Sequence, residues 1–166
     1  MHLRPEAPAD HAAVHEINVA AFGGEAEARL VDMLRQQARP LVSLVADEGG
    51  TLVGHIMFSP VTLHRFTGLM MGLAPMAVAP ARQRRGVGSA LVRAGLERCR
   101  EIGAAAVVVL GHPDFYPRFG FLPAGRFDLT SEYDVPAEAF MAIELAPHGL
   151  RGAGGTVSYH PALGAI

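Results

Sequence analysis

The sequence predicts a single α+β domain, in which a mostly antiparallel sheet contains one central parallel strand–helix–strand unit. Two amphipathic helical patterns open the chain, glycine-punctuated strand patterns follow, and a helix then separates two strongly apolar strands. A glycine hairpin joins antiparallel strands, whereas a helical crossover joins parallel ones, so the sheet is mixed. A length of 166 residues suits one hydrophobic core, and we expect residues 1–166 to form one domain.

Two helices are expected at the beginning of the chain. The first opens at Pro8 and places Val14 and Ile17 at helical spacing, and the pair Gly23-Gly24 ends it. The second covers residues 25–37, with four apolar residues on its inner side: Ala28, Leu30, Val31 and Leu34.

The remaining patterns predict a sheet and one central helix at residues 86–102. A Glu-Gly-Gly turn at residues 48–50 joins the first two strands as a hairpin. The strand at residues 104–110 is apolar throughout, which is typical of a strand covered on both faces. A short helix is expected around residues 114–119, and a glycine-rich connection at residues 149–155. The expected strands are residues 41–47, 51–60, 69–80, 104–110, 121–123, 140–145 and 156–159.

Composition and charge exclude several classes of protein. A formal net charge of −2 provides no global basic field, so nucleic acid is not an expected partner. The most apolar stretches are too short to span a bilayer, and the N-terminus lacks the apolar core of a signal peptide. Cys99 is the only cysteine, which excludes an intrachain disulfide, and the eight histidines lack metal-ligand spacing. We therefore expect a cytoplasmic protein without membrane contact or bound metal.

The segment most informative about function connects the strand at residues 69–80 to the central helix. The first turn of a helix has unpaired N–H groups and the positive end of the helix dipole. Gly86 and Gly88 lack a Cβ, so backbone amides there can approach an anion closely. Arg82, Arg84 and Arg85 add positive charge. The segment is predicted to bind a diphosphate, and the alternative is a surface loop whose glycines serve only a tight turn.

Two other phosphate-binding motifs fit this segment poorly. No Lys-Ser or Lys-Thr pair follows the glycines, which excludes a Walker P-loop. Leu91 stands where the dinucleotide-binding G-x-G-x-x-G pattern requires its third glycine.

Two motifs resemble one known family. Gln83-Arg84-Arg85-Gly86-Val87-Gly88 resembles the Q/R-x-x-G-x-G/A signature of the GNAT superfamily of N-acetyltransferases. The later run at residues 111–121, Gly-His-Pro-Asp-Phe-Tyr-Pro-Arg-Phe-Gly-Phe, is similar to one bacterial branch of that superfamily, as is the segment at residues 140–145. The order of elements agrees over nearly the whole chain. The resemblance implies a GNAT fold whose parallel unit binds CoA, and transfer of an acetyl group from acetyl-CoA to an amine without a metal.

The resemblance also implies which residues bind the cosubstrate. Backbone amides of residues 84–89 would hold the pyrophosphate, and main-chain groups at residues 76–78 would pair with the pantetheine arm like an added strand. The implied set is Met76, Ala77, Val78, Gln83, Arg84, Arg85, Gly86, Val87, Gly88 and Ser89.

Pro75 supports such a geometry independently. Proline cannot donate to a sheet ladder, so a proline inside a buried strand predicts a bulge or an unpaired edge. A strand that leaves its parallel neighbour here would open a cleft between Met76 and residues 106–110. This is where members of the family place the thioester.

The chemistry requires a neutral amine and a protonated leaving thiol. Neutralising an amine of pKa about 10.4 at pH 7 costs about 4.6 kcal/mol without help. Tyr116 matches the family's usual acid, four residues before Gly120, and its alternative role is packing between Phe115 and Phe119. A tyrosine can donate a proton to a thiolate.

No general base is assigned from the sequence. Many family members carry a carboxylate on the pantetheine strand, whereas residues 73–79 contain none. His112 lies close to the expected chemistry but could equally form a turn, and His55 is better explained as a hydrogen-bonded structural histidine. Proton loss through water and backbone carbonyls would need no side chain.

The sequence leaves several alternative functions open. Without a visible base, the chain could be a non-catalytic acyl-CoA-binding module that regulates a partner, and transfer of a longer acyl group is a third possibility. The acceptor could be a small molecule or a protein, with its pocket shaped by residues 22–27 and 126–136. Exposed sheet edges are compatible with a homodimer.

Overall fold

The computed structural model describes residues 1–165 as three α-helices and nine strands, joined by short 3₁₀ turns. The helices are α1 (His11–Phe22), α2 (Ala26–Gln37) and α3 (Val87–Glu101). The strands are β1 (His2–Pro5), β2 (Val42–Glu48), β3 (Thr51–Leu63), β4 (Leu69–Val78), β5 (Ala104–Leu110), β6 (Leu122–Pro123), β7 (Leu129–Ser131), β8 (Phe140–Glu144) and β9 (Gly155–Ser158).

The sheet is mixed, as the sequence predicts. Its strands follow the order β1-β2-β3-β4-β5-β8-β6, and β4 and β5 are parallel while the other neighbours in this order are antiparallel. The strand β9 pairs with the end of β3 instead of extending the far edge, and it forms a second parallel pair with β7 that the sequence did not predict. The expectation of a single parallel unit was therefore incomplete.

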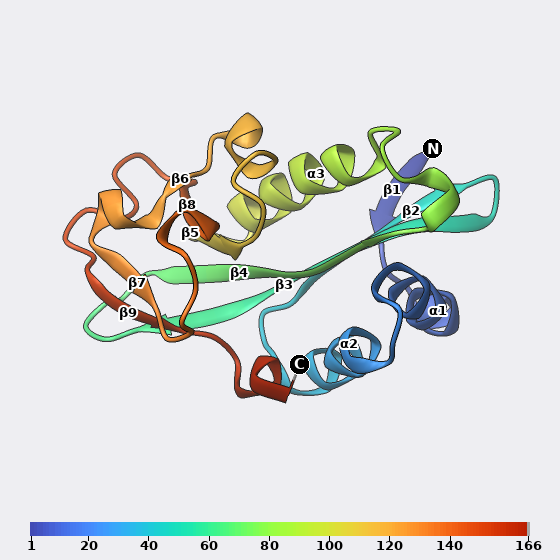
Figure 1. The fold of residues 1–166 in the computed structure, drawn as a ribbon, viewed down its shortest axis with the longest axis horizontal. Helices are drawn as coiled ribbons and strands as arrows, with labels where there is room; N and C mark the ends of the chain where they lie inside the picture. The colour runs from blue at the N-terminus through green and yellow to red at the C-terminus, as the bar shows by residue number, and fades with distance from the viewer. Residues whose placement is uncertain (166) are drawn as a thin grey trace.

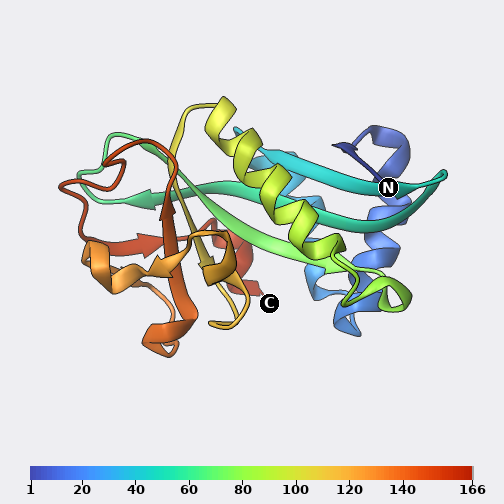
Figure 2. The ribbon, with the colours of Figure 1, turned by 90° about the horizontal axis from the view of Figure 1, so that it is seen from above.

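Helices cover both faces of the sheet. Figure 1 shows α3 above the strands and α1 and α2 below them, and Figure 2 shows α3 running diagonally across the long strands. The hydrophobic core is correspondingly split into one cluster on each face. The helix α3 lies very close to β3, because a Cβ on Gly95 would stand 2.2 Å from a ring carbon of Phe58. This close packing holds the middle of α3 against the sheet.

A bulge interrupts β4 at Ala74 and Pro75. Before the bulge Leu73 lies opposite Phe58, and after it Met76 lies opposite Ile56, so three residues of β4 match two of β3. Pairing with β5 ends at the same point, where Leu73 meets Val109. Within residues 1–165, the following part of β4 pairs only with β3. The bulge and the unpaired edge expected at Pro75 are both present.

Most element boundaries agree with the sequence patterns, and the differences have local causes. The central helix begins at Val87 because Gly86, at φ +86°, does not continue the helical backbone. The strand β3 extends to Leu63, beyond the predicted end at Pro60. The sequence patterns missed β1 and β7, since strands of four and three residues are too short to display an alternation.

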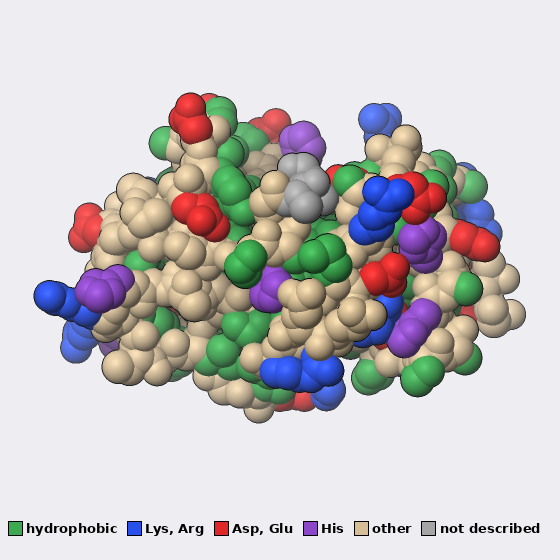
Figure 3. All heavy atoms as spheres, turned by 90° about the horizontal axis from the view of Figure 1, so that it is seen from below, with side chains coloured by type: hydrophobic (Ala, Val, Ile, Leu, Met, Phe, Trp, Pro, Cys, Tyr) green, Lys and Arg blue, Asp and Glu red, His purple; other side chains and the backbone are tan. Residues whose placement is uncertain are grey.

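The face formed by α1, α2 and the C-terminal segment carries mixed charges. Figure 3 shows acidic, basic and histidine side chains interspersed over it, with small hydrophobic groups between them. In the part of the chain that the structure describes, no helix is both long and apolar enough to cross a membrane.

Candidate functional site

The loop at residues 84–89 presents unpaired backbone amides. Within residues 1–165, none of its six N–H groups donates to a protein acceptor, and the first paired amide is that of Ala90, which bonds to the carbonyl of Gly86. Arg84 and Gly86 have φ angles of +64° and +86°, while Arg85 between them does not have a positive φ. Alternation of this kind turns successive N–H groups toward one side and forms an anion-binding concavity.

Two side chains of the preceding turn are less available to bind a cosubstrate than the sequence suggested. Arg82 donates to Glu48 at 2.9 Å, so part of its charge is already neutralised. Gln83 donates its side-chain amide to the carbonyl oxygen of Val78 at 3.1 Å. Val78 is one of the three residues expected to pair with a pantetheine arm. Arg84 and Arg85 are exposed and form no ion pair in the described chain.

A groove continues from the loop into the gap between β4 and β5. A cavity of about 490 Å³ lies against Gly86, Gly88 and Ser89. A second cavity of about 780 Å³ reaches Leu73, Pro75 and Leu110, where the two strands have separated. Both cavities share the walls Met76, Gln83, Arg84, Phe115 and Arg118, which makes them one continuous groove. The larger cavity is called the cleft below.

Tyr116 lines the cleft and is also packed against aromatic neighbours. Its ring meets Phe115 and Phe121 edge-on, with centroids 5.0 and 5.6 Å apart, and only 7% of the residue is exposed. A Cβ on Gly111 would stand 2.4 Å from the ring, so glycine is required there. Burial raises the pKa of Tyr116 to about 12, and its hydroxyl makes no hydrogen bond to residues 1–165. Packing and a proton-donating role are compatible.

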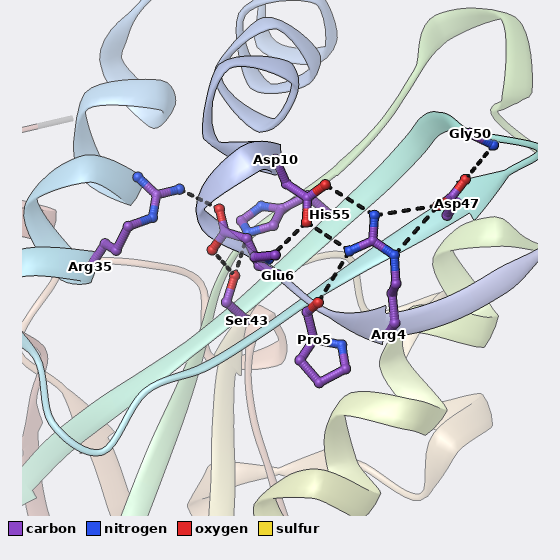
Figure 4. Close-up of polar contacts among 10 residues, drawn as sticks. Arg4, Pro5, Glu6, Asp10, Arg35, Ser43, Asp47, Gly50 and His55 are labelled. Atoms are coloured by element: carbon purple, nitrogen blue, oxygen red, sulfur yellow. Dashed lines mark hydrogen bonds and ion pairs between the residues drawn. The ribbon is translucent and has the colours of Figure 1, made fainter.

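His55 belongs to a buried network on the other side of the sheet. Its Nε2 lies 2.9 Å from Ser43, and its Nδ1 lies 3.4 Å from the amide of Asn18. The Ser43 hydroxyl donates to Glu6, which also pairs with Arg35 (Figure 4). Because that hydroxyl has one proton, Nε2 of His55 must donate to it, and Nδ1 accepts. Burial lowers the pKa of His55 to about 4, which keeps it neutral. The structural role expected for His55 is what this geometry supports.

Three other titratable side chains reach the cleft. His112 and Asp114 follow β5 and are exposed, and the carbonyl of His112 accepts the N–H of Phe115, so this residue does open a turn. Glu27 enters from α2 and is half-buried. Its approach depends on how α2 crosses the sheet, which no local sequence pattern reports. The expectation that residues 22–27 line the cleft holds for Phe22 and Glu27, whereas none of residues 126–136 lines it.

Metal ligands do not gather anywhere in the described part of the chain. Residues 1–165 contain no group of three or more histidine, cysteine, aspartate or glutamate side chains that could hold an ion together.

Comparisons with known proteins assign the family. The Acetyltransferase (GNAT) family matches residues 11–121. The chain is 37% identical over 161 residues to the uncharacterized N-acetyltransferase YhbS of Escherichia coli strain K12, covering 96% of each chain. A crystal structure of Escherichia coli YhbS in complex with CoA superposes with a TM-score of 0.91 at 35% identity, covering 98% of this chain and 91% of that one.

A second solved structure agrees. A GNAT family acetyltransferase from Brucella melitensis in complex with acetyl-CoA gives a TM-score of 0.79 at 35% identity, covering 98% of this chain and 97% of that one. Family, fold and close relatives lead to one assignment. The chain belongs to the GNAT family and is an N-acetyltransferase.

Proposed function

We propose that this enzyme transfers an acetyl group directly from acetyl-CoA to a primary amine of a small molecule or a protein. The observation that carries the proposal is the row of six unpaired amides at residues 84–89, which leads into a cleft between two diverging strands. Two relatives of the same fold were crystallised with CoA or acetyl-CoA.

The groove fits the parts of acetyl-CoA in order. The amides of residues 84–89 and the guanidinium groups of Arg84 and Arg85 would hold the diphosphate, because amides at a helix N-terminus favour an anion. A Cβ on Gly88 would make only an ordinary contact, at 3.6 Å, with the terminal methyl of Met76, and glycine leaves that space in the groove free. The free edge of residues 76–78 would pair with the pantetheine amides once the Gln83 side chain releases Val78.

The thioester would then lie in the cleft beside Tyr116. Attack by the neutral amine forms the C–N bond, and the C–S bond breaks with its electron pair on sulfur. The thiol of CoA resembles cysteine, with a pKa of roughly 8.5. Tyr116, protonated throughout the physiological range, donates the proton that sulfur takes up and recovers one from the amine nitrogen or solvent.

Two measurements test this proposal against its rival, a regulatory module that binds acyl-CoA without turnover. The rival is kept because residues 73–79 carry no carboxylate to act as a base. Calorimetry should detect CoA binding, and acetyl-CoA with a panel of primary amines should release free CoA. Tight binding without CoA release on any amine would favour the module, and absence of CoA binding would refute both.

A further inference from the structure

Glu27 is an unpaired carboxylate at the wall of the cleft. It stands in the first turn of α2, is half-buried, and forms no hydrogen bond or ion pair within residues 1–165. Its neighbour Glu25 bonds to His15 at 2.8 Å and does not line the cleft. Desolvating a carboxylate without a partner costs free energy, so a partly buried one in a cleft favours a cationic ligand.

Acidic side chains line only one end of the groove. The cavity against residues 84–89 is lined by Arg84 and Arg118 and by no acidic residue. The cleft shares these two arginines and adds the carboxylates of Glu27 and Asp114, which offset their charge. The cationic end suits a diphosphate, and the end with carboxylates suits the opposite charge.

Glu27 also reaches the cleft from the face where an acceptor would approach. The loop at residues 84–89 leads into α3 on one face of the sheet, and α2 covers the other (Figure 1). A thioester entering the gap from the α3 side leaves its carbonyl open toward α2. Phe22, an exposed apolar side chain at the end of α1, lines the same entrance. Asp114 is the weaker candidate because it is exposed and follows β5 on the wall that carries Tyr116.

We infer that Glu27 binds the ammonium group of the acceptor and takes its proton, and that the acceptor is a cationic primary amine with an apolar substituent that packs on Phe22. This inference rests on the proposed function. One ammonium proton passes to the Glu27 carboxylate, and the nitrogen lone pair then attacks the thioester carbon. Loss of the second proton from nitrogen gives the neutral amide, while sulfur takes up the proton that Tyr116 donates. Glu27 returns its proton to water.

The experiment compares the wild type with Glu27→Gln, which keeps the side-chain shape and removes the charge. With 2-phenylethylamine as the acceptor, kcat/KM for the amine should fall about 100-fold or more, as loss of a general base and a charged partner predicts. The Kd for acetyl-CoA, measured by calorimetry, should change by less than about twofold. The wild type should prefer 2-phenylethylamine to glutamate at least about tenfold, and Glu27→Gln should lose most of this preference.

Matched variants separate the outcomes. Glu25→Gln removes a carboxylate from the same connection outside the cleft and should retain wild-type kinetics, and Glu27→Asp should recover part of the activity. If Glu27→Gln turns over the amine as fast as the wild type, the inference is overturned and the proposed function stands. A large loss in Asp114→Asn with none in Glu27→Gln would assign the role to Asp114 instead. If no amine tested, 2-phenylethylamine included, gives release of CoA from acetyl-CoA, the proposed function itself is overturned.

Discussion

The rings of His55 and Tyr116 are both buried and both carry polar atoms, but their surroundings differ. The ring of His55 has a partner for each nitrogen and is completely enclosed by β2, β3 and α1. The ring of Tyr116 is enclosed by aromatic groups and by Gly111, but its hydroxyl has no partner in the described chain and its residue lines the cleft.

The region around each ring differs in the same way as the ring itself. The network around His55 pairs most of its polar atoms internally, with Glu6 bonded to both Ser43 and Arg35, although Asn18 Oδ1 and Arg35 Nε have no partner within residues 1–165. The groove instead contains unsatisfied donors, first the amides of residues 84–89 and then Tyr116. Buried polar groups are normally paired. The groove differs from the network in having six consecutive unpaired amides, which one anionic ligand can bind together, whereas the unpaired atoms of the network are isolated.

The largest expected effect lies in the 84–89 loop. Gly86→Glu should abolish measurable CoA binding in calorimetry, because it places a bulky carboxylate among the amides that would hold the diphosphate. Gly86→Ala is the matched control, since both variants must adopt the positive φ of this position, at a cost of roughly 1–2 kcal/mol. The alanine variant should retain binding within about tenfold. Equal loss in both would mean that strain, and not occupation of an anion site, explains the effect.

The next effect concerns the His55 network and pH. The pKa of His55 is about 4 in the folded protein against an ordinary value of 6.5, so the unfolded chain binds the proton more readily. Stability is fully present above pH 6.5 and falls as pH drops toward 4, by an amount on the order of 3 kcal/mol. Denaturant unfolding across this range measures the loss.

His55→Gln provides the control for this pH dependence. It removes the titrating group, so the slope between pH 6.5 and 4 should flatten even though the variant starts less stable. Asp10 contributes in a different window, because Arg4 lowers the pKa of Asp10 to about 2 and its contribution is lost only below pH 3.8. Identical slopes in wild type and variant would contradict the assignment to His55.

The smallest effect is expected at Tyr116. Tyr116→Phe removes a hydroxyl without a protein partner, so the melting temperature and the Kd for acetyl-CoA should stay nearly unchanged. The value of kcat should fall about 10- to 100-fold if this group protonates the thiolate. If kcat is unchanged at every pH tested, Tyr116 has only a packing role, and it would then be a structural residue like His55.

The sequence predicted features whose signal lies within one segment of the chain, and it missed contacts between distant segments. Helical spacing located α1 and α2, and uninterrupted apolar residues located β5, because each signal lies within one segment. The loop before α3 could be recognised for the same reason. Glu27 could not, because its place at the cleft results from packing α2 across the sheet. The pairing of Arg82 with Glu48 was missed likewise, since it joins residues 34 positions apart.

The bulge in β4 has a consequence for how this region can vary. Met71 and Leu73 face the α3 side of the sheet, and after the bulge Met76 and Val78 face it too, so odd positions give way to even ones. Removing one residue at Ala74 or Pro75 would restore simple alternation and leave Met76 and Val78 facing the α3 side, whereas removing both would turn residues 76–78 over to the opposite face. A single-residue deletion at this point should therefore keep the faces of residues 76–78 but remove the bulge at which β4 and β5 stop pairing.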